Sequence, residues 1–311
     1  MTVDLLVAGG GPAGLATALY AARAGLSVLV REPRAGAIDK ACGEGLMPGA
    51  VARLAALGVD PPGAVLRGIR YESGRRFAEA RFHGPPGRGV RRTALHAALL
   101  EAVAEAGVEV QASRVVDVRQ DEDGVRVDGT RARYLVAADG LHSPLRRRLG
   151  LDVPARGPRR YGLRRHVAVA PWRDLVEVHW ADDAEAYVTP VGAAEVGVAI
   201  LTTRRRPYAE QLAAFPDLQE RLRGTVTTTV RGAGPLRQRA RHPVAGRVLL
   251  VGDAGGYVDA LTGEGISLAL AQADAAVQAV RAGRPEEYAT ARRSIVRRYR
   301  LLTEALLTVS A

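Results

Sequence analysis

Near its N-terminus, the chain carries a glycine cluster whose spacing could place a phosphorylated ligand against the backbone. The run satisfies G-x-G-x-x-G and contributes Gly9, Gly11, Pro12, Ala13 and Gly14. Such residues permit a tight turn close to a pyrophosphate, and the N–H groups opening the following helix attract its negative charge. Alone, this motif is a weak indication of a dinucleotide site.

Glu32 could complete that site. It ends the second apolar run, at about the 20-residue spacing typical of a carboxylate that accepts hydrogen bonds from ribose hydroxyls. The alternative is an ordinary glutamate at a strand end. We favour the ribose role because a strand, a glycine turn, a helix and a second strand occur in the required order.

A second cluster lies near the other end of the chain, after an apolar run at residues 248–251. It comprises Gly252, Asp253, Gly263, Gly265 and Ile266. Because the later glycines open a long apolar helix, one carboxylate and one helix N-terminus would face a single ligand. Glu264, in the first turn, is expected to favour the helix dipole, with proton transfer as the alternative.

The expected elements explain how these groups meet. Short apolar runs at 3–8 and 27–30 flank a helical pattern at 12–24, which predicts a β-α-β unit and a parallel sheet. From residue 161 to 201 the pattern changes to short strands with alternating polar and apolar residues, as in an antiparallel sheet. The β-rich part is therefore expected to be inserted into the nucleotide-binding part.

Composition narrows the class of protein. The net charge is +11, but the arginines are scattered and no basic tail is present, so we expect no nucleic-acid partner. Cys42 is the only cysteine, which predicts neither a disulfide framework nor a metal site and fits a reducing compartment. No apolar run reaches the length of a membrane span, so a cytoplasmic protein is expected.

Two further segments resemble a known superfamily. Residues 138–147 resemble the A-D-G-x-x-S-x-x-R motif of the flavin monooxygenase and geranylgeranyl reductase superfamily, and the second glycine cluster resembles its third motif. The resemblance covers nearly the whole chain. It implies FAD, bound tightly but not covalently, with Asp253 at the ribityl hydroxyls, Arg92 near the phosphates and Asp139 at the cofactor.

The superfamily shares the para-hydroxybenzoate hydroxylase fold. The resemblance therefore implies an α/β protein in which a Rossmann-like FAD-binding domain carries an inserted, mainly antiparallel β-sheet substrate domain. We assign residues 1–70, 92–155 and 241–311 to the FAD-binding domain, and residues 71–91 and 156–240 to the substrate domain.

Residues 40–48 resemble the C-G-x-G-L segment of geranylgeranyl reductases and, less closely, the G-E-x-x-x-P turn of flavin halogenases. This resemblance implies that Cys42, Gly43 and Glu44 lie in the substrate pocket, near the flavin ring. Cys42 is either a small buried apolar residue or a reactant, and we favour the former.

The inserted sheet forms the substrate wall in this superfamily, which makes Arg164 and Tyr187 candidate pocket residues. His166 and His179 are candidate catalytic residues on the same sheet. Either could deprotonate a phenol or orient a polar group at neutral pH, although a histidine on a sheet is more often structural.

These features favour a single-component FAD-dependent monooxygenase that hydroxylates or epoxidises an aromatic or isoprenoid-derived small molecule, in secondary metabolism. By resemblance, NAD(P)H would bind transiently and dioxygen would be the second substrate. The alternative is an ene reductase of the geranylgeranyl reductase type. The Thr-Gly-Glu-Gly run at 262–265 favours the reductase, whereas residues 185–190 lack the tryptophan of its Y-x-W-x-F-P segment.

Two other classes are less favoured. A halogenase would need a lysine after Lys40 and a W-x-W-x-I-P motif, and the sequence has neither. A flavin-binding protein without turnover stays as a further alternative. The chain ends earlier than the superfamily leads us to expect, so another segment or a second copy could complete the pocket, and a homodimer stays open.

Overall fold

The computed structural model describes residues 2–74 and 76–309, and its first sheet carries the nucleotide-binding elements. The strand order is β20-β21-β11-β1-β2-β8, and β1 pairs in parallel with both β11 and β2. A β9–β10 hairpin extends this sheet at β11. The principal strands are β1 (Thr2–Ala8), β2 (Val28–Arg31), β8 (Glu109–Gln111), β11 (Thr130–Ala137), β20 (Val244–Ala245) and β21 (Val248–Leu250), with β9 (Val118–Gln120) and β10 (Val125–Val127) in the hairpin.

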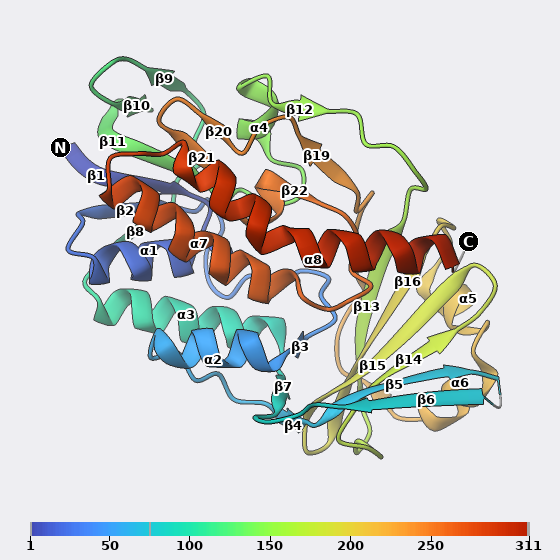
Figure 1. The fold of residues 1–311 in the computed structure, drawn as a ribbon. Coiled ribbons are helices and arrows are strands. Elements are labelled where there is room, and N and C mark those ends of the chain that lie inside the picture. Colours follow the sequence, from blue (N-terminus) through green and yellow to red (C-terminus); the bar gives the residue numbers. More distant parts are fainter. Residues whose placement is uncertain (1, 75, 310–311) are drawn as a thin grey trace.

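Helices cover one face of this sheet (Figure 1). They are α1 (Pro12–Arg23), α2 (Pro48–Ala56), α3 (Arg92–Glu105) and α7 (Gly265–Arg281). Their apolar side chains and one face of the strands form the largest core cluster. The other face packs against the β9–β10 hairpin and α4 (Pro144–Arg148) in a second cluster. This layering is expected for a parallel sheet, both of whose faces must be buried.

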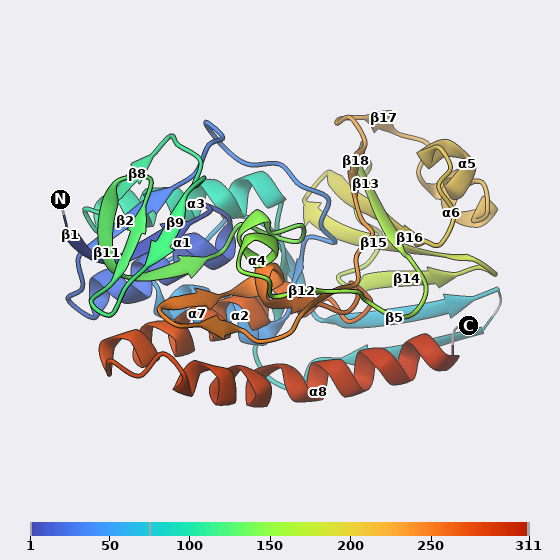
Figure 2. The same ribbon diagram turned by 90° about the horizontal axis from the view of Figure 1, so that it is seen from above.

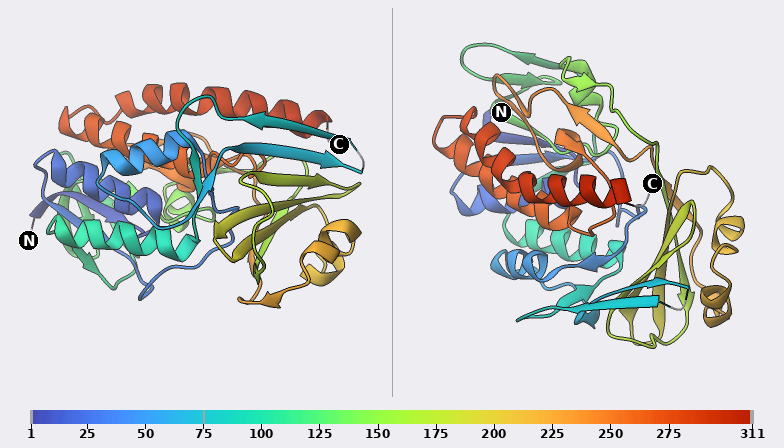
Figure 3. Two further views of the ribbon diagram at one scale, coloured as in Figure 1. Left: turned by 90° about the horizontal axis from the view of Figure 1, so that it is seen from below. Right: turned by 45° about the vertical axis from the view of Figure 1, so that its right-hand side comes forward.

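The second large sheet lies at the other end of the molecule (Figure 3). Its order is β17-β13-β16-β15-β14-β5-β6, antiparallel throughout except where β14 meets β5, and β18 pairs with β13. The strands are β5 (Gly68–Ser73), β6 (Arg76–Arg81), β13 (Tyr161–Ala168), β14 (Val176–Trp180), β15 (Ala184–Gly192), β16 (Glu195–Thr202), β17 (Thr225–Val226) and β18 (Arg231–Ala233).

Each face of this sheet has its own apolar cluster. One face packs under α5 (Tyr208–Leu212) and α6 (Pro216–Arg221). The other face, with Val176, Val178 and Leu201, belongs to a cluster that includes residues of the glycine-rich segments. This second face looks toward the nucleotide-binding half, where a ligand could contact both.

Smaller elements join the two halves. A three-stranded sheet of β3 (Gly45–Leu46), β4 (Ala64–Leu66) and β7 (Gly87–Gly89) lies between them, and β12 (Asp152–Val153), β19 (Gln238–Ala240) and β22 (Gly256–Tyr257) form another. Helix α8 (Glu287–Val309) runs alongside both halves (Figure 2). It packs against α7 and, through Leu306 and Leu307, against the cluster under the antiparallel sheet.

The predicted fold class is confirmed: an α/β nucleotide-binding half carries a mainly antiparallel sheet. The domain boundaries stay predictions. The antiparallel sheet begins at Gly68, slightly before the predicted boundary at residue 71, and β7 pairs with strands of the joining sheet. Within the described part of the chain, no helix is both long enough and apolar enough to cross a membrane.

Candidate functional site

A large cavity lies between the two halves, and most of the predicted site residues line it. From the predicted cofactor set, the lining includes Gly11, Pro12, Ala13, Arg92, Asp139, Gly252, Asp253, Gly263, Gly265 and Ile266. All the predicted pocket residues, Cys42, Gly43, Glu44, Arg164 and Tyr187, line it as well. Segments far apart in the chain therefore meet around one space, as the sequence motifs require.

The first glycine turn is built by close backbone contacts. Gly9 has a φ of +107°, and a Cβ atom on Gly14 would stand 1.8 Å from the Gly9 carbonyl oxygen. Neither residue lines the cavity, so both shape the turn. Gly11 differs, because a Cβ there would meet no atom within 4 Å. The start of α1, which has no side-chain cap, is thus open to an anionic ligand.

Glu32 lies behind this turn. Its carboxylate accepts hydrogen bonds from the Gly10 N–H at 2.8 Å and from the Arg34 guanidinium at 2.7 and 3.0 Å. Burial opposes the charge, but these bonds outweigh it and hold the pKa of Glu32 below its usual value. Arg34, not Glu32, lines the cavity. A ribose would have to share the carboxylate with Arg34, and the ribose role stays a prediction.

Two buried polar groups face the cavity without a full set of partners. The Nη1 atom of Arg92 and the Oδ1 atom of Asp139 have no hydrogen-bond partner among the described residues. Burial lowers the pKa of Arg92 and raises that of Asp139. Since buried polar groups in proteins are nearly always hydrogen-bonded, these two atoms fit a polar ligand such as a dinucleotide.

The second glycine cluster meets the first at the end of β21. Gly252 has a φ of +64°, and a Cβ on it would approach the Ala13 Cβ within 2.9 Å. Helix α7 starts at Gly265 and has no side-chain cap, so its N–H groups also point at the cavity. Glu264 lies at the N-cap position, half-buried and outside the lining, and its predicted role stays untested.

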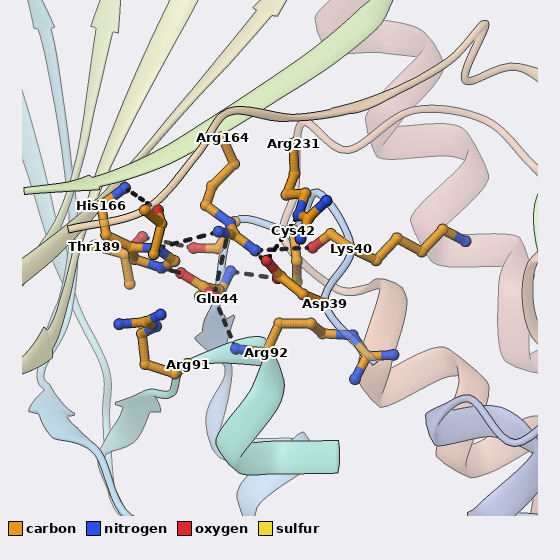
Figure 4. Close-up of polar contacts among 12 residues, drawn as sticks. Asp39, Lys40, Cys42, Glu44, Arg91, Arg92, Arg164, His166, Thr189 and Arg231 are labelled. Carbon is orange, nitrogen blue, oxygen red and sulfur yellow. Dashed lines mark hydrogen bonds and ion pairs between the residues drawn. The ribbon is translucent and has the colours of Figure 1, made fainter. Parts of the chain in front are cut away.

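Residues 39–45 connect the cofactor side to the antiparallel sheet through a buried polar network (Figure 4). The Glu44 carboxylate accepts from the Arg92 N–H at 2.7 Å and pairs with His166 Nε2 at 2.6 Å. Arg164 pairs with Asp39 and donates to the Lys40 carbonyl oxygen at 3.2 Å. Glu44 adopts a φ of +60°, uncommon for a non-glycine residue, so its place in the network holds it in a strained conformation.

His166 is fully buried and lies behind Glu44, outside the cavity lining. Arg164 Nη1 lies 3.1 Å from His166 Nδ1. Because a guanidinium can only donate hydrogen bonds, Nδ1 must be the acceptor. The proton of the ring therefore lies on Nε2, directed at Glu44. The sequence-based role as a base toward substrate finds no support in this arrangement, because the lone pair is occupied and turned away.

His179, the other predicted catalytic histidine, does not line the cavity. It contacts Glu177 at 3.2 Å and Glu72 at 3.5 Å, on the sheet face opposite to Val176 and Val178, which line the cavity. Alternation along a strand explains the difference, because neighbouring side chains point to opposite faces. The sequence pattern placed His179 on the correct strand but could not decide which face looks at the ligand.

The sequence did not single out His96, which supports the first glycine turn. Its Nδ1 atom accepts from the Ile38 N–H at 3.2 Å, so Nε2 carries the proton and donates to the Gly10 carbonyl oxygen at 2.8 Å. Burial lowers the pKa of this histidine. His96 lies four residues after Arg92 and therefore on the same face of the helix. This spacing could have indicated from the sequence that His96 lies near the cofactor side.

Apolar side chains form the wall of the cavity on the side of the antiparallel sheet. They are Ile69, Leu163, Val176, Val178, Leu201, Leu236 and Leu261. No histidine lines the cavity among the described residues, nor do these residues contain a group of three or more potential metal ligands. The site therefore combines a polar, glycine-rich end with an apolar end.

These features define a dinucleotide-dependent flavoprotein with an apolar substrate wall, and comparison with known proteins agrees. Residues 2–282 match the FAD binding domain family. The chain belongs to this family and is an FAD-dependent oxidoreductase.

Two relatives are reductases. The chain is 32% identical over 310 residues to menaquinone reductase of Mycobacterium tuberculosis, covering 86% of this chain and 74% of the relative. It is 31% identical over 309 residues to digeranylgeranylglycerophospholipid reductase 1 of Methanopyrus kandleri, covering 87% and 78%. The recognised superfamily is thus confirmed, and these relatives favour the reductase alternative over the monooxygenase.

Solved structures share the fold. A geranylgeranyl bacteriochlorophyll reductase-like protein from Thermoplasma acidophilum gives a TM-score of 0.83 at 24% identity, over 96% of this chain and 84% of that one. The myxobacterial chondrochloren halogenase CndH gives 0.83 at 22% identity, over 99% and 82%. At such identities the likeness establishes architecture, which reductases and halogenases have in common.

Proposed function

We propose that this chain is an FAD-dependent reductase that saturates a carbon–carbon double bond in an isoprenoid chain. Two relatives more than 30% identical to it are named as reductases, and one of these names includes the digeranylgeranyl group. The observation that carries the proposal is the apolar wall opposite the glycine-rich end. A prenyl chain has no polar atoms, so the apolar residues of this wall can enclose it without burying an unpaired polar group of the ligand.

The same wall argues against hydroxylation of an aromatic substrate, one of the monooxygenase reactions that the sequence favoured. Deprotonating a phenol would require a base facing the substrate, and both histidines predicted for that role lie outside the cavity lining. Reduction of a double bond needs no such base. Instead it needs two electrons and two protons, together with a site from which water and oxygen are excluded.

The residues present fit FAD. The open backbone at Gly11, the α1 N-terminus and the unpartnered Arg92 nitrogen would hold its pyrophosphate, and Asp253 would bind the ribityl hydroxyls. The α7 N-terminus would stabilise negative charge on the ring. When bound and reduced, FAD supplies the hydride equivalent. NAD(P)H, acting transiently, is the proposed source of the electrons.

The chain's own side chains would manage water and protons. The apolar wall excludes water from the reacting double bond. Cys42 lines the cavity, and burial together with Glu44 raises the pKa of its thiol, which therefore stays protonated at neutral pH.

Product mass tests the proposal. The FAD-loaded protein, reduced by dithionite without oxygen, is incubated with geranylgeranyl lipids and the products are analysed by mass spectrometry. Gain of two hydrogen atoms for each double bond supports reduction. Gain of an oxygen atom from an aerobic reaction with NAD(P)H, without hydrogenation, would restore the monooxygenase. An Asp253→Ala variant serves as control, because weaker FAD retention should lower either activity.

A further inference from the structure

Strand β15 presents two hydroxyl groups to the substrate side of the cavity. Tyr187 and Thr189 are alternate residues of this strand, so they lie on the same face of the sheet, and both line the cavity. Apolar residues surround them on the neighbouring strands, including Val178 and Ala199. Their hydrogen-bonding capacity therefore matters for any ligand that reaches this wall.

Each of the two hydroxyl groups already donates its only proton to another group of the protein. The Tyr187 hydroxyl donates to Glu185 Oε2 at 2.7 Å, and the Thr189 hydroxyl donates to the Gly43 carbonyl oxygen at 2.7 Å. A hydroxyl group has one proton and two lone pairs. With the proton engaged, each oxygen can offer a ligand only an acceptor.

The Tyr187 proton is held firmly because Glu185 is itself fixed. Its other carboxylate oxygen pairs with Arg160 Nη2 at 2.9 Å, and both side chains are more than nine-tenths buried. Turning the hydroxyl toward a ligand would remove a hydrogen bond to a buried carboxylate. A neutral hydrogen bond to a ligand carbonyl would return less free energy than this loss costs, because hydrogen bonds to charged groups are the stronger ones.

Protonation of the tyrosine is equally well defined. Burial, reinforced by the Glu185 carboxylate, raises the pKa of Tyr187 well above its usual value, so the hydroxyl keeps its proton across the physiological range. Tyr187 therefore remains a donor to Glu185 and an acceptor toward the cavity.

We infer that β15 is a specificity element that selects an isoprenoid substrate carrying a hydrogen-bond donor, such as a hydroxyl group, over one with an ether or carbonyl oxygen at the same place. This inference rests on the proposed function and narrows its substrate class. An ether or carbonyl oxygen has lone pairs but no proton to donate. At this wall it would face the lone pairs of the Tyr187 and Thr189 oxygens, and neither hydroxyl oxygen would receive a hydrogen bond. Sites that hydrogen-bond a substrate hydroxyl reject analogues that lack it.

A matched pair of ligands tests the inference. In the methyl ether of geranylgeraniol a methyl group replaces the hydroxyl proton, which is the only donor of the alcohol. Each of the two ligands is titrated into the oxidised, FAD-loaded protein while flavin absorbance is followed. We expect the alcohol to bind about tenfold more tightly, which corresponds to one well-formed hydrogen bond. In Glu185→Gln the ratio should fall toward one, because a neutral amide holds the Tyr187 proton less firmly. Tyr187→Phe should lose the preference as well.

Glu177→Gln is the matched control. Glu177 is a buried glutamate on the opposite face of the adjacent strand, bonded to Trp172 and His179, so the ratio should stay that of the wild type. Equal affinity of the wild type for both ligands, or an unchanged ratio in both β15 variants, would overturn the inference while leaving the reductase proposal intact. If neither ligand binds, the isoprenoid reductase proposal fails and this inference fails with it.

Discussion

The two walls of the cavity are built by different means. On the cofactor side, backbone atoms do most of the work, because glycine turns and two helix N-termini face the cavity. On the substrate side, side chains do the work: buried ion pairs and hydrogen bonds join residues more than a hundred positions apart, as between Glu44 and His166. A backbone site can be recognised from a short motif, whereas a side-chain site depends on which distant residues meet.

The two walls also differ in which of their residues can be replaced. Gly9 and Gly14 tolerate no side chain, because the space that a Cβ would need is filled by backbone. On the β15 wall, by contrast, Tyr187 is held by Glu185, and Glu185 is held by Arg160, so side-chain partners fix these residues. Cofactor chemistry is therefore tied to the backbone, while substrate choice can change with a few side chains.

The largest effect is expected where the two walls are joined. Glu44→Ala should lower the free energy of unfolding by about 3–5 kcal/mol, because it leaves the buried Arg164 and His166 without their shared partner. FAD affinity should fall as well, since the Arg92 N–H loses its acceptor. Urea unfolding and FAD titration measure both quantities. Glu177→Gln is the control: a loss of stability with unchanged FAD affinity is expected, and an equal loss of FAD affinity there would break the distinction between the walls.

A pair of glycine substitutions sharpens the backbone side of the comparison. Gly14→Ala should destabilise the protein by about 1–3 kcal/mol or more, because its methyl group meets the Gly9 carbonyl oxygen. Gly11→Ala has free space around it and should leave thermal unfolding of the FAD-free protein unchanged while weakening FAD binding. If Gly11→Ala instead bound FAD as the wild type does, the proposed approach of the pyrophosphate to this turn would be wrong.

The smallest expected effect comes from His96, a side chain within the backbone-built wall. Burial holds its pKa below the ordinary value of about 6.5, so the unfolded chain takes up a proton that the folded chain resists. This contribution to stability is present above about pH 6.5 and is lost as the pH falls toward the lower folded pKa. His96→Asn should remove that part of the pH dependence, measured by urea unfolding at about pH 7.5 and about pH 5.5. An unchanged pH dependence would show that other groups cause it, and His242→Gln, at an exposed histidine, is the control.

Much of the site could be predicted from local sequence. The turn at Gly9–Gly14 and the strand-to-helix passage from Gly252 to Gly265 are recognisable because their residue types are demanded by backbone geometry within a few positions. His179 and His166 could not be judged in that way. Both lie in the expected β-rich part, but the face that each ring occupies follows from the pairing of the strands and the partners across the sheet.

By itself, the sequence determined the nucleotide-binding architecture, the superfamily and FAD as the cofactor, because the steric demands of the glycine turns act between residues that are close in the chain. Only the tertiary structure decided that Glu44, Arg164 and His166 form one buried network and that Tyr187 turns its proton toward Glu185. The contacts of that network join segments that lie far apart in the chain and have no recognisable spacing in the sequence. Burial and charge pairing arise only when the folded chain packs these segments together.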